Sequence, residues 1–240
     1  MLSFLRPRSA KAFTPLTTDI HSHLLAAIDD GVRSTEEALA IIRVFQDAGY
    51  KKMITTPHVM QDYYRNDSAI ILERLDDLRK YALQQGVEFE IQAAAEYYLD
   101  EALSRKIEDR EPLLVFGDHY LLFETNMINE PYSLKDFIFK VTTAGYKPVL
   151  AHPERYGYMT LEKAEDLRNR GVLFQMNILS IIGYYSKPIQ RLGHQFIDRG
   201  WIDLLGSDCH NIEQARLLQA AQKNKYFQKA LALPLLNHTL

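Results

Sequence analysis

The sequence predicts a single α/β barrel in which about seven parallel strands alternate with helices. Short runs rich in β-branched and apolar residues alternate with longer amphipathic runs along the whole chain, as in repeated βα units. His, Asp and Glu residues follow nearly every one of the short runs. A barrel brings all of its strand ends to one mouth, whereas an open doubly wound sheet gathers its site at one switch point. A barrel is therefore favoured.

Length and composition favour one domain. The chain has 240 residues, of which 47% are hydrophobic and 25% charged, and α/β barrels of this size are common as single units. No Pro/Gly/Ser-rich linker or low-complexity segment interrupts the pattern. We expect residues 1–18 to be a basic N-terminal tail or docking segment and residues 19–240 to form the barrel.

The first βα unit is the clearest. A strand is expected at 17–21 and a helix at 34–48. Ser34 is suited to cap the helix N-terminus, Glu37 favours its first turn, and Gly49 is suited to end it.

The next strands follow the same rule. A second strand is expected at 52–56, followed by a long helix at 67–85 that Gly86 ends. A third strand is expected at 88–95, rich in alternating apolar residues.

The central units contain short helices that end at glycine. A fourth strand at 120–124 precedes a helix at 134–144, which stops at Gly145. A fifth strand at 148–151 precedes a helix at 161–170.

Two further units complete the pattern. A sixth strand is expected at 172–177 with a helix at 188–199, and a seventh at 202–205 with a helix at 212–221.

Charge and cysteine content limit the function classes. The net charge of −3 argues against a general nucleic-acid or anionic-membrane binder, which usually carries a basic excess. Cys209 is the only cysteine, so no intramolecular disulfide can form, and a cytoplasmic location is expected. No apolar run approaches the roughly 20 residues that cross a bilayer. We expect Cys209 to be a small buried apolar residue.

Nine metal-ligand candidates follow the predicted strands. Each alone could be a hydrogen-bonded or solvated group, but together at one mouth they would repel one another strongly without a countercharge, which divalent metals supply. Only the sixth strand ends without an imidazole or carboxylate. The candidates are His21, His23, one of Asp29 or Asp30, His58, Glu96, Glu124, His152, Asp208 and His210.

The spacing of these residues supports chelation. Residues i and i+2 of a strand point to the same side, so His21 and His23 can bind one ion, as can Asp208 and His210. Mixed imidazole and carboxylate donors suit Mn²⁺, Fe²⁺ or Zn²⁺. Nine donors exceed the needs of one ion, so two or three ions are expected, an arrangement suited to phosphoester hydrolysis.

Two arginines are candidates for binding the phosphoryl group. Arg155 lies three residues beyond His152, and Arg216 lies six residues beyond His210. Guanidinium groups bind tetrahedral oxyanions through two hydrogen bonds. A solvent-facing salt bridge is the alternative for each arginine.

Tyrosines follow several of the same strand ends. Tyr64, Tyr97, Tyr98, Tyr156 and Tyr158 could stack on an aromatic substrate or form an amphipathic rim.

These motifs resemble the polymerase and histidinol phosphatase (PHP) superfamily, which has an opening His-x-His and a closing Asp-x-His. More narrowly, they resemble the manganese-dependent protein-tyrosine phosphatases of bacterial capsule and exopolysaccharide operons, the CpsB/YwqE-like group. The resemblance covers residues 19–216. The strings that carry it are DIHSH at 19–23, DDG at 29–31, TPH at 56–58, HPERY at 152–156 and SDCHN at 207–211.

The resemblance implies a distorted (β/α)7 TIM-like barrel of the PHP fold with three divalent ions, most often Mn²⁺. One ion would be held by His21, His23, Glu96 and Asp208, the second by Glu96, Glu124 and His152, and the third by His58, His210 and Asp30 or Asp29. Arg155 and Arg216 would bind the phosphoryl group.

Two departures from the family pattern stand out. The chain carries some 15 residues before the first strand, and Arg216 is followed by two leucines where Arg-Pro-Pro is common.

The implied activity is hydrolysis of phosphotyrosine on a protein, such as the tail of a bacterial tyrosine kinase of polysaccharide export, by a metal-activated hydroxide. Three alternatives stay open: a small-molecule phosphatase such as one acting on histidinol phosphate, a nuclease, which the net charge disfavours, and a metal-binding regulatory barrel without activity. An amidohydrolase-type enzyme also begins with His-x-His but usually needs a lysine bridge. The oligomeric state is left open.

Overall fold

Parallel strands form two sheets in the computed structural model, which describes residues 15–240. A three-stranded sheet has the order β1-β2-β4, and a six-stranded sheet has the order β3-β5-β6-β7-β8-β9. The strands are β1 (Thr18–Asp19), β2 (Lys52–Thr55), β3 (His58–Val59), β4 (Glu90–Ala93), β5 (Glu96–Tyr98), β6 (Tyr120–Glu124), β7 (Lys147–Ala151), β8 (Leu173–Asn177) and β9 (Leu204–Gly206).

All seven predicted strand positions contain a strand, but the second and third are each split in two. Thr55 pairs with Ala93 in the first sheet, and His58 pairs with Glu96 in the second, so the register continues across the break. Pro57 lies at the break and has no N–H to donate to a ladder. The predicted bounds 52–56 and 88–95 therefore included residues that form no ladder.

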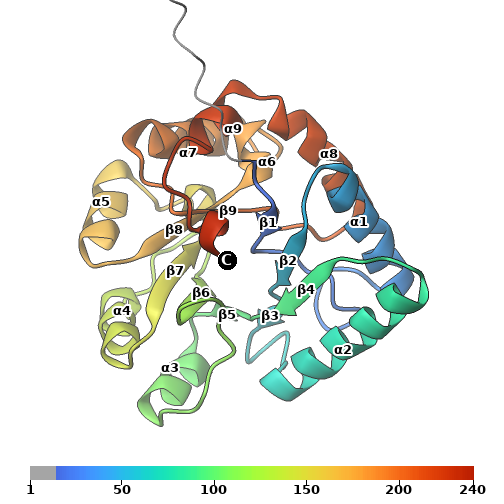
Figure 1. Cartoon of the computed structure of the whole chain (residues 1–240). Coiled ribbons are helices and arrows are strands. Elements are labelled where there is room, and N and C mark those ends of the chain that lie inside the picture. The colour runs from blue at the N-terminus through green and yellow to red at the C-terminus, as the bar shows by residue number, and fades with distance from the viewer. Residues whose placement is uncertain (1–14) are drawn as a thin grey trace, which may run out of the picture.

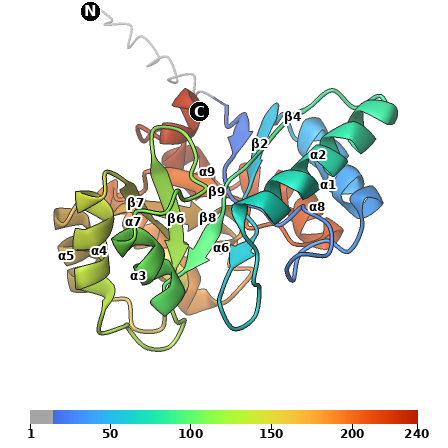
Figure 2. The same cartoon turned by 90° about the horizontal axis from the view of Figure 1, so that it is seen from below.

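Helices surround the curled sheet, which lies at the centre of the ring in Figure 1. The C-terminus lies at one end of the strands, and the loop from β3 to α2 lies at the opposite end (Figure 2). The helices are α1 (Thr35–Asp47), α2 (Ser68–Gln84), α3 (Glu101–Glu108), α4 (Leu134–Thr143), α5 (Leu161–Asn169), α6 (Ile178–Ile181), α7 (Lys187–Arg199), α8 (Ile212–Gln222) and α9 (Lys225–Ala230), with short 3-10 turns η1 (Pro153–Arg155) and η2 (Leu236–Thr239).

The predicted helix caps are confirmed for the first unit. The Glu37 backbone N–H donates to Ser34 Oγ at 3.2 Å, which satisfies one of the free N–H groups at the start of α1. The helix ends at Asp47 with Ala48 as its C-cap, and Gly49 has φ +94°, a conformation that residues with a Cβ rarely adopt.

Three helices were not predicted: α3, α6 and α9. The signal for α3 was present, because Asp100 caps its N-terminus and Leu103 and Ile107, four residues apart, form its buried face. With α3 in place, a helix follows the third strand position as it follows the others. The two remaining helices are only four and six residues long.

The interior of the curled sheet is filled with apolar side chains. Ile54, Leu122, Val149 and Leu204 belong to one buried cluster, whereas the residues beside them in each strand pack outward against the helices. This alternation is the period of two that side chains follow along a strand. The centre of the sheet is therefore a packed core.

The segments that follow β1 and β9 are hydrogen-bonded to each other. Near the strand ends, His23 N–H donates to Cys209 O at 2.9 Å, and Asp208 N–H donates to His21 O at 2.8 Å. At the opposite end, Asn237 of η2 spans the gap.

The Asn237 amide reaches both edge strands. Its Nδ2 donates to Thr18 O at 3.1 Å and to Leu205 O at 2.8 Å, and its Oδ1 accepts from Leu205 N–H at 2.9 Å. One side chain thus replaces a stretch of ladder between the first and last strands.

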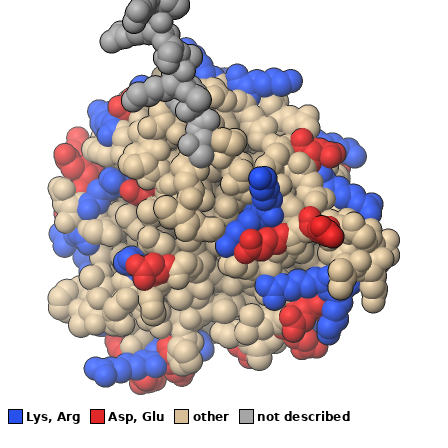
Figure 3. Space-filling model, viewed as in Figure 1, with Lys and Arg blue, Asp and Glu red and all other residues tan. Residues whose placement is uncertain are grey.

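The expected N-terminal tail lies largely outside the described residues, and its assignment stays a prediction. Thr17 O accepts hydrogen bonds from Lys51 and Lys52, so the chain has joined the sheet by residue 17. Within residues 15–240, no helix combines the length and apolar character needed to cross a membrane. Cys209 is buried, as expected. On the face shown in Figure 3, acidic and basic side chains are interspersed.

Candidate metal centre

Three of the metal-ligand candidates, His58, Glu96 and Glu124, continue inward-facing rows of the sheet. Below the site these rows are apolar, and at the carboxyl ends of the strands they change to donor residues. Ile54 leads through Thr56 to His58, and Leu122 leads to Glu124. Because side chains alternate along a strand, Glu96 and Glu124 point to the same side as Ala94 and Leu122, the buried apolar residues two positions before them.

His21 and His23 direct one ring nitrogen each at a shared point. Their Nε2 atoms lie 3.3 Å apart, and each lies within 3.5 Å of Asp208 Oδ1. Their Nδ1 atoms form hydrogen bonds on the opposite side of each ring: His21 Nδ1 with Gln175 Oε1 at 2.7 Å, and His23 Nδ1 with Asp29 Oδ2 at 2.8 Å. These outer contacts fix the orientation of both rings.

Glu96 lies at the centre of the cluster and is fully buried. Its Oε2 lies 3.1 Å from His21 Nε2 and 3.1 Å from His58 Nδ1, and its Oε1 lies 3.2 Å from His152 Nε2. A carboxylate with both oxygens facing different imidazoles is placed to bridge two cations.

The remaining donors lie toward solvent. His58 Nδ1 is 3.1 Å from Glu124 Oε1, while its Nε2 is 3.4 Å from Asp30 Oδ1. His210 Nε2 lies 3.5 Å from the same Asp30 oxygen. Asp30 is half exposed, so this part of the cluster faces the mouth.

The structure separates the two aspartates that the sequence left open. Asp29 is buried, and its oxygens accept hydrogen bonds from His23 Nδ1, from Gly31 N–H at 2.9 Å and from His58 N–H at 3.1 Å. Asp30 instead turns its carboxylate toward His58 and His210. Asp29 is therefore placed to orient ligands and Asp30 to act as one.

The nine candidates fall into four overlapping groups whose donor atoms lie within 4.8 Å of one another. No predicted ligand position is left out of these groups, so sequence positions nearly 190 residues apart meet at one place. The groups are His23, Asp30, His58 and His210; His21, His23 and Asp208; His21, Glu96 and His152; and His58, Glu96 and Glu124.

The donor arrangement fits divalent cations better than a hydrogen-bonded network. With Nδ1 of His21 and of His23 donating outward, the two Nε2 atoms face each other as acceptors unless they are protonated. His58 Nδ1 is buried and lies 3.1 Å from two carboxylates, yet forms no hydrogen bond. A cation between these donors would satisfy all of them.

Two of the candidates have left-handed backbones. His152 has φ 36° and Asp208 has φ 53°, a region that costs a residue other than glycine roughly 1–3 kcal/mol. In both cases the strand has just ended, and the turn directs the side chain into the cluster. Such strain gathers at functional sites.

The electrostatics of the metal-free cluster are strongly perturbed. Burial lowers the pKa of His21, but the carboxylates of Glu96 and Asp208 outweigh burial and raise that pKa to about 9. Burial opposes ionisation of Glu96, yet His21 and His58 hold the Glu96 pKa well below its usual range. The imidazoles therefore carry the positive charge that cations would otherwise provide.

Arg155 faces the cluster from η1. Its Nη1 donates to Asp208 Oδ2 at 2.7 Å, and its guanidinium carbon lies 4.5 Å from the centre of the Tyr185 ring. The side chain is three-quarters buried. This cation is held beside the candidate ligands rather than in a solvent-facing salt bridge.

Arg216 has no comparable contact. It lies on α8 with its side chain exposed, and the described part of the chain offers it no hydrogen bond or ion pair. The structure does not bring it to the cluster.

The tyrosines differ in their environments. Tyr156 is buried, and its hydroxyl accepts from Thr125 N–H. Tyr97 is also buried, and its hydroxyl accepts from Leu114 N–H. Tyr64 instead stacks on His58, with ring centroids 5.5 Å apart and planes 13° apart. Of these three, only Tyr64 borders the cluster as a half-exposed ring.

Sequence reasoning missed the contribution of β8. Gln175 orients His21, and Asn177 Nδ2 donates to Asp208 Oδ2 at 2.7 Å. Gln175 Nε2 in turn donates to Asn177 Oδ1. The signal was their spacing of two at the one strand end without an imidazole or carboxylate.

Comparison with known proteins places these features in context. A family model described as capsular polysaccharide synthesis, CpsB/CapC, matches residues 17–233. The tyrosine-protein phosphatase YwqE of Bacillus subtilis (strain 168) is 25% identical, over 81% of this chain and 78% of that protein. The tyrosine-protein phosphatase CpsB of Streptococcus pneumoniae is also 25% identical, over 81% of this chain and 83% of that protein.

Solved structures share the fold. A crystal structure from work on YwqE of Bacillus subtilis and CpsB of Streptococcus pneumoniae, described as unique metal-dependent tyrosine phosphatases, matches with a TM-score of 0.81 at 24% identity and covers 90% of each chain. The lactonase Lmo2620 of Listeria monocytogenes matches with a TM-score of 0.53 at 12% identity, covering 90% of this chain and 91% of that one.

Proposed function

The chain belongs to the CpsB/CapC family of capsular polysaccharide synthesis proteins, and from this premise we propose that it is a metal-dependent phosphatase that hydrolyses phosphotyrosine on proteins. The observation that carries the proposal is the meeting of nine imidazole and carboxylate donors, with a buried arginine beside them. The phosphatase names of the relatives agree with the chemistry of this donor set.

Three divalent ions, Mn²⁺ in preference to Fe²⁺ or Zn²⁺, are proposed as the resident metals. The donors support more than one ion, because they form four overlapping groups and Glu96 faces three imidazoles. When bound, such ions supply a nucleophile derived from water at neutral pH and positive charge against the phosphoryl oxygens. Every candidate offers nitrogen or oxygen and none offers sulfur, which suits these metals.

Arg155 is proposed to position the phosphoryl group of the substrate. Arg155 donates to Asp208 and is stacked near Tyr185, so its guanidinium is held in one orientation. A planar guanidinium can bind two phosphoryl oxygens through parallel hydrogen bonds and stabilise charge that develops on them. Phenolate is a good leaving group, so hydrolysis of an aryl ester needs less protonation than hydrolysis of an alkyl ester.

We further propose that the curled sheet is a distorted seven-unit barrel closed between β1 and β9. The hydrogen bonds of His23 with Cys209 and of Asp208 with His21 support closure at the mouth. Asn237 supports it at the opposite end. Closure would fix the distance between His21 and Asp208, which follow the two strands at the seam.

Single substitutions test the proposed activity. Purified protein with added Mn²⁺ should hydrolyse a phosphotyrosine peptide and should lose nearly all turnover in His21→Ala and in Asp208→Ala. Arg155→Ala should lower kcat/KM by about 10²–10³ while metal binding persists, since one preorganised donor to the reacting oxygens is removed.

A matched control removes a histidine outside the cluster. His238 is exposed near the C-terminus, so His238→Ala should retain wild-type turnover. Undiminished hydrolysis by metal-stripped protein, or by His21→Ala, would rule out the proposed chemistry. Equal turnover of phosphoserine and phosphotyrosine peptides would rule out the proposed substrate class.

A further inference from the structure

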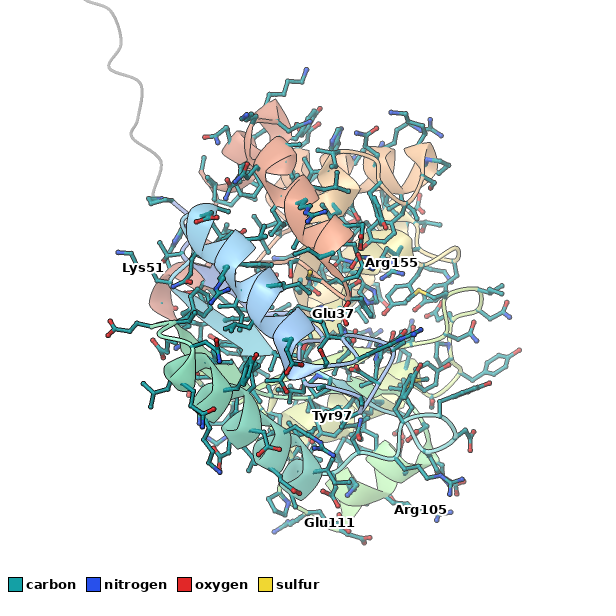
Figure 4. The ribbon with its side chains drawn as sticks, turned by 90° about the vertical axis from the view of Figure 1, so that its right-hand side faces the viewer. Glu37, Lys51, Tyr97, Arg105, Glu111 and Arg155 are labelled. Atoms are coloured by element: carbon teal, nitrogen blue, oxygen red, sulfur yellow. The ribbon has the colours of Figure 1, made fainter. Side chains whose placement is uncertain are left out.

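A cavity of about 430 Å³ lies beside the metal-ligand cluster, between the loop that follows β3 and the helix α3. Its lining includes the apolar side chains of Val59, Tyr97 and Leu103. Ala102 of α3 also lines the cavity, with a small side chain that occupies little of it. The volume lies within the range of roughly 300–1,000 Å³ typical of ligand sites. In the view of Figure 4, Tyr97 is drawn below Arg155 and above Arg105 of α3.

Tyr64 joins the cavity to the cluster. Its ring stacks on His58 and also lines the cavity. One aromatic ring therefore separates a candidate metal ligand from an apolar space. A ligand anchored at the cluster has to pass Tyr64 to reach the cavity.

The cavity wall is held in place by hydrogen bonds. Met60 and Tyr64 exchange backbone hydrogen bonds, which closes the loop into a tight turn. Gln61 N–H donates to Asp100 Oδ2 at 2.9 Å, which ties the loop to the start of α3. Asn66 Nδ2 donates to His58 O at 2.8 Å. The cavity is thus built from a braced loop.

The lining of the cavity contains two cations, Arg65 and Lys106, and one carboxylate, Asp100. Arg65 is exposed, and its Nε donates to Gln61 O, but it forms no ion pair within residues 15–240. Lys106 lies on the opposite side and pairs with Glu111. Asp100, the carboxylate of the lining, already accepts from two backbone N–H groups. Arg65 and Asp100 are therefore the charged residues of the lining that form no ion pair within residues 15–240, and Arg65 is the exposed cation of the two.

We propose that this cavity is a specificity subsite for the polypeptide substrate and binds a large apolar or aromatic side chain close to the phosphotyrosine. The proposal rests on the proposed function. The apolar lining selects the side chain, and Arg65 adds a preference for an acidic residue beside it.

The position of that side chain follows from the geometry of an extended peptide. Successive residues rise about 3.3 Å, so side chains on the same face are roughly 7 Å apart. The Tyr64 and His58 rings are separated by 5.5 Å. An extended peptide whose phosphotyrosine is bound at the cluster can therefore run past the Tyr64 ring and present the side chain two residues away to the cavity.

The test compares two fluorescent peptides that carry a non-hydrolysable phosphotyrosine mimic and differ only at that position, Phe against Ala. Binding is measured by anisotropy with Mn²⁺ present. The Phe peptide should bind at least about tenfold more tightly, because a side chain that fills an apolar pocket gains at least this much. Arg65→Ala should weaken binding of a peptide with an adjacent Asp and leave its Asn counterpart unchanged.

Ala102→Trp fills the cavity without touching the cluster, and Glu101→Trp is its matched control, since Glu101 neighbours it on α3 with its side chain exposed. Ala102→Trp should abolish the preference for Phe, and Glu101→Trp should retain it. Both variants should hydrolyse p-nitrophenyl phosphate at the wild-type rate, because that small ester does not reach the cavity.

Equal affinity of the wild type for the two peptides overturns the subsite, even if p-nitrophenyl phosphate is hydrolysed. Loss of the preference in both tryptophan variants overturns it as well. A wild type that prefers the Phe peptide and loses the preference only in Ala102→Trp supports the subsite even if no ester is hydrolysed, in which case the proposed function alone fails.

Discussion

Replacing Asp29 by Asn should show that this residue orients the metal ligands without binding metal itself. Asp29 accepts three hydrogen bonds: from His23 Nδ1 at 2.8 Å, from Gly31 N–H at 2.9 Å and from His58 N–H at 3.1 Å. All three partners are donors, which a carboxylate satisfies and an amide does not.

The side-chain amide introduced by Asp29→Asn would have two orientations, and each is unfavourable. If its NH₂ group faces Gly31, two donors oppose each other. If the NH₂ group faces His23 and His58, it opposes His58 N–H and forces His23 to carry its proton on Nε2, the nitrogen aimed at the cluster. The second orientation blocks ligation.

The magnitude follows from these contacts. One buried donor left unpaired costs about 1–3 kcal/mol, which lowers the unfolding temperature of a chain of this size by roughly 2–12 °C. Loss of an orienting contact to a ligating histidine typically lowers metal affinity by about 10–100-fold. Asp29→Asn should show both effects.

The assay combines thermal unfolding of metal-stripped proteins with calorimetric Mn²⁺ titration, and Asp30→Asn is the matched comparison. The Asp30 carboxylate is 51% exposed, so its replacement should leave the unfolding temperature of the metal-free protein nearly unchanged and weaken Mn²⁺ binding directly. Wild-type stability and wild-type metal affinity in Asp29→Asn would refute the assignment of this residue.

The remaining predictions concern pH, packing and the seam of the sheet. The pKa of His21 is raised from 6.5 to about 9, so the stability that protonated His21 contributes is complete below pH 6.5 and is lost as pH rises through 9. Metal-free protein should therefore unfold at a lower temperature above pH 9 than at pH 6.5. Binding of Mn²⁺ at pH 7 should release protons into the buffer. Gly206→Ala would place a Cβ 2.6 Å from the Cβ of His21 and 2.8 Å from Gln175 Nε2. Calorimetry should therefore show weaker Mn²⁺ binding, and denaturation should show that the free energy of unfolding falls by about 1–3 kcal/mol. Unchanged Mn²⁺ affinity would show that this close approach does not position His21. Asn237→Ala leaves backbone groups of Thr18 and Leu205 unpaired at a cost of roughly 1–3 kcal/mol each. Urea denaturation should therefore show a less stable protein, and calorimetry should show an unchanged Mn²⁺ affinity. Unaltered stability would mean that water replaces the amide.

The strand ends and their donors could be predicted from the sequence because both depend on short periodicities. His21 and His23 are two residues apart, as are Asp208 and His210, and each pair lies at the end of a predicted strand. The helix cap at Ser34 rests on an equally local rule and is confirmed.

Features that depend on tertiary contacts could not be predicted. Whether Asp29 or Asp30 faces the other donors depends on how the loop before Gly31 turns. Two adjacent aspartates in a sequence do not show which side chain turns inward. The positive φ values of His152 and Asp208 arise where strands end against the cluster. The break between β2 and β3 at Pro57 was predictable in principle, because proline cannot donate to a ladder, whereas the matching break at Ala94 and Ala95 carries no such signal.

Five points stay predictions: the metal identity, the number of ions, the phosphoryl-binding role of Arg216, a kinase as the protein substrate and a cytoplasmic location. Arg216 is exposed on α8, and the two leucines that follow it depart from the family pattern.

A crystal structure of the protein grown with Mn²⁺, with anomalous scattering recorded at the manganese edge, tests the central claim most directly. We expect three anomalous peaks among the four donor groups, with Glu96 between two of them and Asp29 bound to none. A map with no peak among these donors, in crystals of folded protein soaked with excess Mn²⁺, would contradict the account.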